Sequence, residues 1–562
     1  MKIYLSQLNP TVGDLNGNCA KILSEFKAAN DAGCDLAVFP EMAICGYPCE
    51  DLWHKPHFIS AVKNKIFEIL EASRNFKCAI LLGSPSTSIN RAKKEVTHNS
   101  AFLIEEGEVK KIINKKTLPN FSVFDEQRYF ESSSTLSVIE FRGLTLAILI
   151  CEDLWDSKNL FLLNEQVVDA VVTINASPYS TQKTAARHKV AENFAKTLGK
   201  PVIYVNQVGG QDSLVFDGSS FVLDGEGESV LRLKEFEEDY GIVEFEKSGP
   251  RREDGVTKLE VRTLNSKLVT PSSLRGQVHE LKSDYSAATL ALRDYLRKNG
   301  FKKVLLGMSG GIDSALVATI AVDALGSENV AIYALPSRFN SETSMIDAQT
   351  CAKNLGLDLK VISIESTFEA MLATLGEISQ LAKENLQSRI RGNILMALSN
   401  DLGALLLSTG NKSELACGYS TLYGDTCGAF NPLKDFYKTR IYELANWRNE
   451  NVPEISLYTH TNLIPQNILT KAPTAELRPN QKDSDSLPEY EILDQILFSL
   501  IEEQKSVAEI IKSGFEEGLV KKVAKLLHTS EYKRRQSCLG PKISEMAFDK
   551  DRRYPITNKF TF

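Results

Sequence analysis

The sequence lacks the cysteine and histidine patterns that hold structural metals. Its ten cysteines are scattered, no Cys-x-x-Cys pair occurs, and no histidine cluster accompanies the nearest two, Cys45 and Cys49. These absences exclude the usual zinc-binding spacings. Scattered thiols are typical of a protein in a reducing compartment, so we expect a cytoplasmic protein.

Positive charge and long apolar runs are also scarce. The net charge is −7, which gives no electrostatic reason to expect nucleic acid or an anionic membrane as a partner. The apolar run Leu144–Ile150 is far too short to span a bilayer. The chain starts directly with the strand-like Ile3-Tyr4-Leu5, so no signal peptide is visible.

The length of the chain predicts more than one domain. It has 562 residues, of which 43% are hydrophobic and 24% charged, as is ordinary for a soluble globular protein. Between residues 247 and 271 the composition changes, because Ser248–Gly255 is charged and rich in turn-forming residues. We therefore predict domains at 1–247 and 283–562, joined by a linker at 248–282.

The most specific motif lies in the second half, at Gly307–Ser314. A strand pattern, Lys303–Leu306, precedes it, and a helix pattern, Ala315–Ala321, follows it. Backbone N–H groups and the positive end of the helix dipole collect anions at such a place. Gly310 and Gly311 would allow a phosphate to approach the backbone closely.

The side chains of this motif indicate which phosphates it holds. Ser309 and Ser314 offer hydroxyl donors, and Asp313 can hold a cation that bridges phosphates. A Walker loop needs a lysine after its last glycine, where this sequence has Ile312. We therefore expect a pyrophosphate cradle rather than a loop for γ-phosphate transfer. The alternative is an ordinary glycine-rich turn.

Three polar side chains in the first half each follow a predicted strand. Glu41 follows the strand pattern 36–39, Lys115 follows a hairpin pattern, and Cys151 ends the buried run Leu144–Ile150. Singly, each has an ordinary explanation: the first two as solvated residues, the third as a buried structural cysteine. A thiol at the tip of a core strand is also a candidate nucleophile, although it needs a neighbouring base or cation to become reactive.

Together, these residues resemble the catalytic triad of the nitrilase (carbon–nitrogen hydrolase) family. The matching motifs, within roughly residues 1–260, are Phe39-Pro40-Glu41, Lys115-x-x-Leu118-Pro119 and Cys151-Glu152-Asp153. The resemblance implies an αββα sandwich. It implies that Glu41 is the general base, that Lys115 stabilises the oxyanion, and that Cys151 attacks a carboxamide to form a thioester. Glu126 resembles the second glutamate that supports this triad in many members.

A further stretch resembles the substrate-holding segment of the family's glutaminases. It runs from Asn175 to Tyr179 and is followed by Lys183 and Arg187. The resemblance implies that Ser177 and Lys183 meet the amino-acid end of glutamine. Phe121 belongs to the same glutamine site, at a position where close relatives often have tyrosine.

From Ser283 onward, strand and helix patterns alternate. Strands are predicted at Val304–Met308, Val330–Leu335 and Leu359–Ile364, with helical patterns between them. This alternation predicts an α/β domain with a doubly wound, Rossmann-like parallel sheet. The glycine-rich motif follows the first of these strands, where such sheets bind nucleotides.

More polar motifs follow in this half. Asn385 and Arg389 are four residues apart on one predicted helix face. Thr409 and Glu414 belong to Ser408–Glu414, a loop at a strand end that carries hydroxyl, glycine and carboxylate groups. Taken separately, each of these is explained by a capped helix end or a solvated charge.

Together with Lys533-Arg534-Arg535 and the segment 418–425, these motifs resemble the ATP-pyrophosphatase domain of the NAD synthetase family over nearly all of 283–562. The resemblance implies that Asn385, Glu414 and Lys533 meet deamido-NAD and that Asp313 and Glu414 hold Mg²⁺. It also implies a homo-oligomer, because the synthetase domain of the family dimerises. The residues that it assigns to ATP are Gly307, Met308, Ser309, Gly310, Gly311, Ile312, Asp313, Ser314 and Thr409.

The two resemblances imply a ligase with glutamine, ATP and deamido-NAD as substrates. Cys151 would release ammonia from glutamine. ATP would adenylate the carboxylate of deamido-NAD with loss of pyrophosphate, and ammonia would then displace AMP to give the carboxamide of NAD. Adenylation is needed because a carboxylate is a poor electrophile, and in-line loss of pyrophosphate suits the cradle.

Two alternatives stay open at this point. The first is an enzyme that uses the same cradle for tRNA thiolation or guanine-nucleotide amination. The negative net charge argues against tRNA as a substrate, and the motifs around Asn385 and Glu414 favour deamido-NAD. The other alternative is a nucleotide-sensing scaffold with an inactive nitrilase domain. The intact Glu41, Lys115 and Cys151 oppose it.

Overall fold

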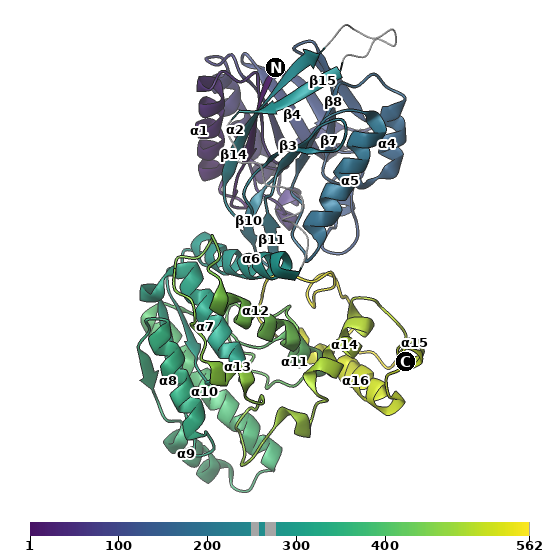
Figure 1. The fold of residues 1–562 in the computed structure, drawn as a ribbon. Coiled ribbons are helices and arrows are strands. Elements are labelled where there is room, and N and C mark those ends of the chain that lie inside the picture. Colours follow the sequence, from purple (N-terminus) through teal and green to yellow (C-terminus); the bar gives the residue numbers. More distant parts are fainter. Residues whose placement is uncertain (249–257, 265–276, 561–562) are drawn as a thin grey trace. The chain divides into compact units, whose positions relative to one another are not determined.

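The computed structural model describes residues 1–248, 258–264 and 277–560. The chain divides into two compact units (Figure 1). Unit 1 consists of Met1–Gln211 and Val215–His279, and unit 2 of Asp212–Leu214 and Glu280–Phe562. In the described part of the chain, no helix is both long and apolar enough to cross a membrane.

The segment predicted as a linker, 248–282, contains regular structure. Strand β15 (Lys258–Thr263) pairs with β14 (Asp239–Ser248) in an antiparallel ladder, and helix α6 (Gln277–Lys298) begins inside the segment. A short strand with alternating charges is hard to distinguish from a loop by its sequence, because the adjacent strand supplies its backbone partners. Residues 249–257 and 265–276 lie outside the described residues.

Unit 1 is built on two sheets that pack face to face. Among the described residues, the strand orders are β15-β14-β1-β2-β3-β4-β5 and β13-β12-β9-β8-β7-β6, and β10 and β11 form a separate hairpin. The strands not yet given are β1 (Lys2–Gln7), β2 (Leu36–Val38), β3 (Ala79–Ile89), β4 (Glu95–Glu105), β5 (Glu108–Asn114), β6 (Ser137–Phe141), β7 (Leu144–Ile150), β8 (Ala170–Asn175), β9 (Val202–Asn206), β10 (Val208–Gln211), β11 (Leu214–Asp217), β12 (Phe221–Leu223) and β13 (Ser229–Arg232).

Strand β7 explains the apolar run at residues 144–150 of the sequence. Leu146, Ile148 and Ile150 belong to the core between the two sheets, whereas Ala147 and Leu149 belong to the core beneath the helices. A strand that is buried on both faces reads as a continuous apolar run. The nucleophile candidate therefore stands at the end of a strand that is buried on both faces.

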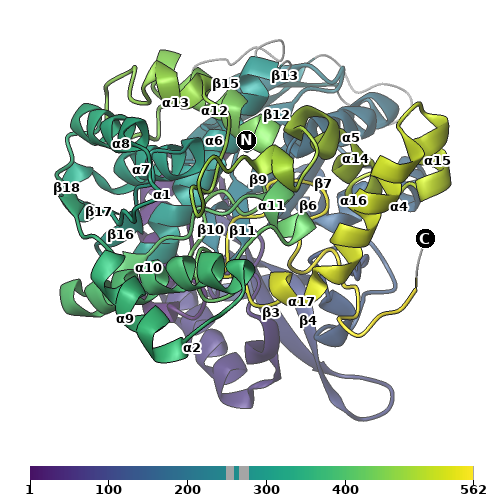
Figure 2. The same ribbon diagram turned by 90° about the horizontal axis from the view of Figure 1, so that it is seen from below.

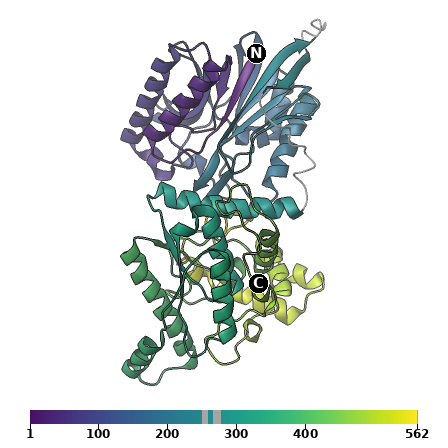
Figure 3. The ribbon, with the colours of Figure 1, turned by 60° about the vertical axis from the view of Figure 1, so that its left-hand side comes forward.

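Helices cover the outer face of each sheet. Helices α1 (Leu15–Asp31) and α2 (Pro56–Ser73) pack on the first sheet, and α4 (Ser157–Asn164) and α5 (Lys183–Leu198) pack on the second (Figure 3). In α1, the carboxylate of Asp14 caps the N-terminus, and Ile22 and Phe26 point into the core. The predicted αββα sandwich is confirmed.

Unit 2 contains a parallel sheet with the order β18-β17-β16-β19. Its strands are β16 (Val304–Gly307), β17 (Val330–Ala334), β18 (Leu359–Val361) and β19 (Leu405–Leu406). Figure 2 shows α7 and α8 on one side of this sheet and α9 and α10 on the other, as predicted for a doubly wound sheet. The helices are α7 (Ile312–Leu325), α8 (Glu342–Asn354), α9 (Glu365–Leu375), α10 (Gln380–Leu402), α11 (Lys412–Cys417), α12 (Lys438–Glu450) and α13 (Gln466–Thr470).

The order of the strands places a binding crevice in unit 2. The chain runs from β16 outward to β17 and β18, then returns to the other side of β16 to form β19. Ligands bind at such a reversal point, beyond the carboxyl ends of the strands. The predicted cradle follows β16, and the segment 408–414 follows β19, so both lie at this edge. The whole of 408–414 was predicted as a loop, but its last three residues form the first turn of α11, because Asn411 caps the N-terminus of that helix.

A separate apolar cluster joins α11 to the C-terminal helices. Buried residues of α11, including Leu415 and Ala416, share one core with residues of α14 (Tyr490–Ile501), α15 (Val507–Lys512) and α16 (Glu517–Thr529). The short helix α17 (Glu531–Arg534) follows. This core fixes α11, which carries Glu414, and with it the preceding loop that carries Thr409.

A buried ion pair fastens the helix that starts at the cradle. Asp323 of α7 accepts two bonds from Arg448 of α12, from Nε at 2.7 Å and from Nη2 at 2.9 Å. The same carboxylate accepts the hydroxyl of Tyr285 of α6 at 2.5 Å. All three side chains are fully buried, so each charge depends on its partner.

Replacing Asp323 with alanine should destabilise unit 2, because Arg448 would remain as a buried charge without its carboxylate. Such losses typically amount to about 3–5 kcal/mol, so we expect a large drop in the urea midpoint of the full chain. The control is Glu517→Gln, which breaks the exposed pair with Lys521 on α16 and should leave the midpoint unchanged. Equal effects of the two substitutions would contradict the stabilising role of the buried pair.

Candidate active sites

Three strand ends bring Glu41, Lys115 and Cys151 together in unit 1. Glu41 follows β2, Lys115 follows β5, and Cys151 follows β7 of the facing sheet. Lys115 Nζ lies 2.9 Å from Glu41 Oε1. All three side chains are buried, and both charges act on the pKa of the Cys151 thiol.

The carboxylate of Glu41 is held from several sides. Its Oε1 accepts from Lys115 Nζ and, at 2.5 Å, from Asn99 Nδ2. Its Oε2 accepts from the backbone N–H of Ala176 at 2.8 Å. These contacts fix the orientation of the carboxylate, as a residue that exchanges protons with a substrate requires.

Lys115 lies between two carboxylates. Its Nζ donates to Glu126 Oε1 at 2.9 Å, the same distance as to Glu41. The Tyr47 hydroxyl also donates to Glu126 Oε1, at 2.9 Å. Burial alone would lower the pKa of Lys115, but Glu126 and Glu41 raise it well above its usual value. The ammonium therefore stays charged inside the protein.

Cys151 has an unusual backbone. Its φ is +48°, a conformation that costs a non-glycine residue energy and is typical of active sites. The turn is fixed by Asp153, whose Oδ1 accepts from Thr117 N at 2.7 Å and whose Oδ2 accepts from Ile150 N at 3.1 Å. Burial, assisted by the charge of Glu41, raises the pKa of the Cys151 thiol well above its ordinary value. In the resting protein this thiol is neutral.

Ser177, assigned to glutamine, is buried just after β8. Its N–H donates to Asn206 Oδ1 at 2.9 Å, and its carbonyl accepts from Arg187 Nη2 at 3.3 Å. Arg187 is in turn paired with Asp217 at 3.0 Å, with both side chains buried. The backbone of Ser177 is thus held in place, one residue after the Ala176 N–H that binds Glu41.

The other two residues assigned to glutamine lie in less enclosed surroundings. Lys183 is the first residue of α5, and its Nζ lies 4.4 Å from the ring centroid of Trp155. Its charge also lowers the pKa of Glu152, a residue next to Cys151, although burial raises that pKa overall. Phe121 is 55% exposed and packs edge-on against Phe124.

In unit 2, the predicted ATP residues except Gly310 line two cavities of about 190 and 270 Å³. The cavities share Ser309 and Thr409. Gly311, Ile312, Asp313 and Ser314 line the smaller one, and Gly307 and Met308 line the larger one. Gly310 has φ +79°, and a Cβ there would lie 2.1 Å from the carbonyl oxygen of Ser344. Only glycine fits this position.

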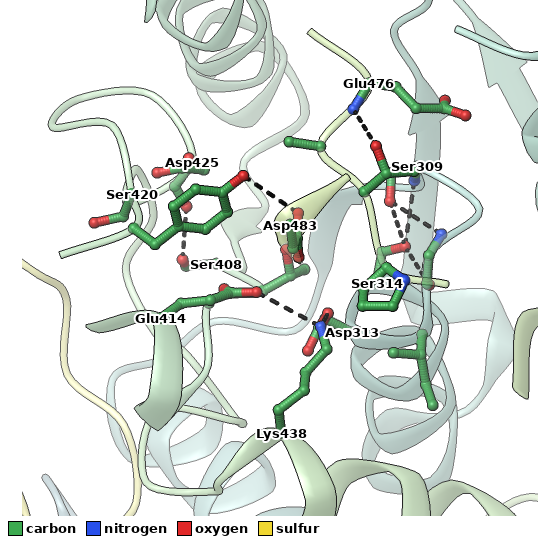
Figure 4. A pocket seen from close by; sticks show the side chains of 18 of the residues that line it. Ser309, Asp313, Ser314, Ser408, Glu414, Ser420, Asp425, Lys438, Glu476 and Asp483 are labelled. Atoms are coloured by element: carbon green, nitrogen blue, oxygen red, sulfur yellow. Dashed lines mark hydrogen bonds and ion pairs between the residues drawn. The ribbon is translucent and has the colours of Figure 1, made fainter. Parts of the chain in front are cut away.

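The two predicted metal ligands face each other across one ammonium (Figure 4). Lys438 forms ion pairs with Asp313 and, at 3.5 Å, with Glu414. Burial raises the pKa of Glu414 to about 8; Asp313 adds to this rise and Lys438 opposes it. In the described part of the chain, no group of three His, Cys, Asp or Glu side chains gathers to hold a metal. Two carboxylates beside a phosphate cradle nevertheless suit Mg²⁺, which is usually held by one or two carboxylates together with substrate phosphates.

The remaining predicted contacts hold a loop beside the smaller cavity. Asn385 Oδ1 accepts from Thr421 Oγ1 at 2.8 Å. Lys533 Nζ donates to the carbonyls of Gly418 and Ser420, both at 2.7 Å. Of these residues, Ser420 lines the smaller cavity itself. Asn385 and Lys533 therefore fix the wall of the site from behind.

Several site residues were not predicted from the sequence. Asn99 and Tyr47 complete the cluster around Glu41 and Glu126, and Lys438 bridges the two carboxylates of unit 2. Asn99 and Tyr47 come from segments with no catalytic pattern, so only the fold could reveal them. A signal did exist for Lys438, because a lysine at a helix start has the wrong sign for the dipole.

Comparisons with known proteins agree with this two-part organisation. The family model described as carbon-nitrogen hydrolase matches residues 2–249, and the one described as NAD synthase matches residues 284–537. The chain thus joins an amide-hydrolysing class to a nucleotide-dependent ligase class. The glutamine-dependent NAD(+) synthetase of Acinetobacter baylyi is 39% identical, with 99% of this chain and 98% of that protein covered. The Aquifex aeolicus protein of the same name is 42% identical, with both chains covered completely.

A solved structure extends the comparison to three dimensions. The glutamine-dependent NAD+ synthetase from Acinetobacter baumannii, in complex with adenosine diphosphate, matches with a TM-score of 0.74 and 37% identity. The match covers 99% of this chain and 98% of that one. The chain belongs to the glutamine-dependent NAD(+) synthetase family.

The pKa of Glu126 generates a prediction about stability. Burial, opposed by Lys115, raises this pKa from its ordinary 4.5 to about 7. Between these values the folded state binds more protons than the unfolded state, so the free energy of unfolding should fall as the pH rises from about 5 to 7. Glu126→Gln should remove this contribution, and the wild type should lose stability relative to the variant over that range.

Urea denaturation of both proteins at pH 5, 6, 7 and 8 would measure this difference. Glu71→Gln, at an exposed position of α2, is the matched control and should give a constant difference from the wild type. A constant difference for Glu126→Gln as well would contradict the prediction.

Proposed function

We propose that this chain amidates deamido-NAD to NAD, with glutamine as the nitrogen donor and ATP as the source of free energy. One observation supports the proposal: a single chain holds both a buried Glu-Lys-Cys cluster and a glycine-rich loop that lines a cavity at the N-terminus of α7. Full-length relatives named for glutamine-dependent NAD(+) synthesis support it. They favour deamido-NAD over the tRNA and guanine-nucleotide alternatives.

In the first half-reaction, Glu41 takes the proton of the Cys151 thiol as its sulfur attacks the carboxamide carbon of glutamine. A general base is needed because burial keeps the thiol neutral. The same proton then passes from Glu41 to the departing nitrogen, which leaves as ammonia. Water, activated by Glu41, hydrolyses the thioester and releases glutamate.

Lys115 stabilises the negative charge that develops on the carbonyl oxygen during both steps. It can do so because Glu126, which itself accepts from the Tyr47 hydroxyl, binds the ammonium of Lys115, and this ammonium stays charged. A cation that is already oriented and desolvated does not have to reorganise when the transition state forms. Ser177 and Lys183 hold the amino-acid end of glutamine, beside Phe121.

In the second half-reaction, the cradle and the N-terminus of α7 bind the phosphates of ATP. The carboxylate of deamido-NAD attacks the α-phosphorus, and pyrophosphate leaves. Ammonia then adds to the adenylated carbonyl, loses a proton and displaces AMP. The deamido-NAD contacts Asn385, Glu414 and Lys533, while the ATP contacts Thr409.

Asp313 and Glu414 would hold Mg²⁺, which would neutralise phosphate charge when bound. Lys438, which binds the same two carboxylates, adds a second positive charge to the cavity. We further propose a cytoplasmic homo-oligomer. All ten cysteines are free, as expected in a reducing compartment. The proposal of a homo-oligomer rests on the resemblance to the NAD synthetase family.

Cys151→Ala should abolish the use of glutamine but not the use of ammonia. With ATP, Mg²⁺ and deamido-NAD, we expect glutamine-dependent NAD formation to fall by at least about 1,000-fold, with the ammonium-dependent rate retained. The buried Cys78 supplies the control, because Cys78→Ala should keep both activities. Loss of both activities in Cys151→Ala, or of neither, would refute the division of labour between the units.

Glu414 should make metal binding depend on pH. Because its pKa is about 8, the metal-free protein holds this proton at neutral pH, and a divalent cation must displace it. Affinity for Mn²⁺, measured by electron paramagnetic resonance, should rise between pH 6 and 8 and level off above. Glu414→Gln should weaken binding and flatten this profile, whereas Glu450→Gln, at an exposed position of α12, should change neither. Unaltered binding in Glu414→Gln would remove Glu414 as a ligand.

A further inference from the structure

We propose that Trp155 is a positioning residue of the glutaminase site, whose indole ring holds the ammonium of Lys183 where the α-carboxylate of glutamine binds. The inference rests on the proposed function, in which Lys183 meets the amino-acid end of glutamine. It adds Trp155 to the machinery, although the indole itself takes no part in the chemistry.

The contact between the two side chains has the geometry of a cation–π interaction. Lys183 Nζ lies 4.4 Å from the centroid of the Trp155 ring, well within the range of about 6 Å over which a cation is attracted to an aromatic face. Both side chains are half-buried, and partial removal of water strengthens the attraction. Tryptophan is the best of the aromatic residues for this contact.

The position of Lys183 in its helix indicates a functional reason for the contact. A cation at a helix N-terminus is opposed by the dipole, yet Lys183 is the first residue of α5, and no acidic residue occupies the first turn. The aromatic face of Trp155 stabilises this ammonium, which also acts on the carboxyl group of Glu152. The charge of Lys183 and the first N–H groups of α5 then act together on an incoming carboxylate.

Helix α3 (Glu152–Trp155) ties the ring to the nucleophile. Cys151 stands directly before this single turn and Trp155 ends it. The turn is immobilised by Asp153, which accepts from the N–H groups of Lys116, at 3.1 Å, and of residues 117 and 150. The backbone from Cys151 to Trp155 is therefore held in place.

The contact with the Trp155 ring restricts the rotamers of the Lys183 side chain. A free lysine carries about 2 kcal/mol of rotamer entropy, much of which would be lost on binding a carboxylate. Because Trp155 orders the Lys183 side chain in the free enzyme, part of this rotamer entropy is lost before glutamine binds. We therefore expect Trp155 to act on glutamine binding and only weakly on the chemical step.

The test compares Trp155→Leu, Trp155→Phe and wild type in glutamine hydrolysis by the full-length enzyme. Trp155→Leu should raise KM for glutamine about 3- to 30-fold, the range that corresponds to a cation–π contact, with kcat changed less than about 3-fold. Trp155→Phe should restore much of the loss. Hydrolysis of propionamide, which has no α-carboxylate, should respond little. Phe161→Leu, at a 71% exposed aromatic of α4, is the matched control and should leave KM unchanged.

A double-mutant cycle with Lys183→Met decides whether Trp155 acts through the lysine. In the Lys183→Met background, Trp155→Leu should add little to KM, because the cation that the ring holds is already gone. Additive effects, or an equal loss with propionamide, would overturn the proposal in favour of a merely structural tryptophan. A wild-type enzyme that makes NAD from ammonium but hydrolyses no glutamine would instead overturn the proposed function, and this inference with it.

Discussion

The constraint on which both sites depend is that an ammonium buried in the protein must be paired. Three lysines, Lys115, Lys412 and Lys438, are almost fully buried, and each lies between two carboxylates. The carboxylate pairs are Glu41 and Glu126, Asp435 and Glu502, and Asp313 and Glu414. A charge left without a partner in such surroundings would cost several kcal/mol, on the order of 3–5. In each case the ion pairs of the lysine connect chain segments that are distant in the sequence.

The three clusters differ in how completely their charges are balanced. Around Lys412, the backbone N–H groups of Ile543 and Ser544 add donors to Asp435, and its pKa is lowered although burial opposes this. In the other two clusters one carboxyl keeps a raised pKa, about 7 for Glu126 and about 8 for Glu414. Burial is the main cause of both rises, and a neighbouring carboxylate adds to each. A carboxyl group with a raised pKa can bind or release a proton near neutral pH, which is typical of functional sites.

The sequence was informative wherever chemistry and local pattern coincide. Cys151 could be predicted because a doubly buried strand has a distinct apolar pattern and ends in a reactive group, and the cradle because glycine is required where the backbone is crowded. Asn99 could not, since its role arises only when distant strands meet. For Lys438 the sequence offered only one signal, a lysine at a helix start, and its two carboxylate partners became visible only in the fold. Strand β15 was hidden for a related reason: its partner, not its own composition, makes it a strand.

The neutral thiol of Cys151 has a consequence for chemical attack on the protein. Peroxides and alkylating reagents react with thiolates, and burial keeps the fraction of thiolate at Cys151 very small. In the proposed mechanism, the nucleophile is thus shielded from oxidative damage until its substrate binds, and it becomes reactive only when a carboxamide is in place and Glu41 can accept the proton. Covalent inhibitors of this site would need an amide-like electrophile that recruits the base, because intrinsic reactivity toward thiols would select other cysteines first.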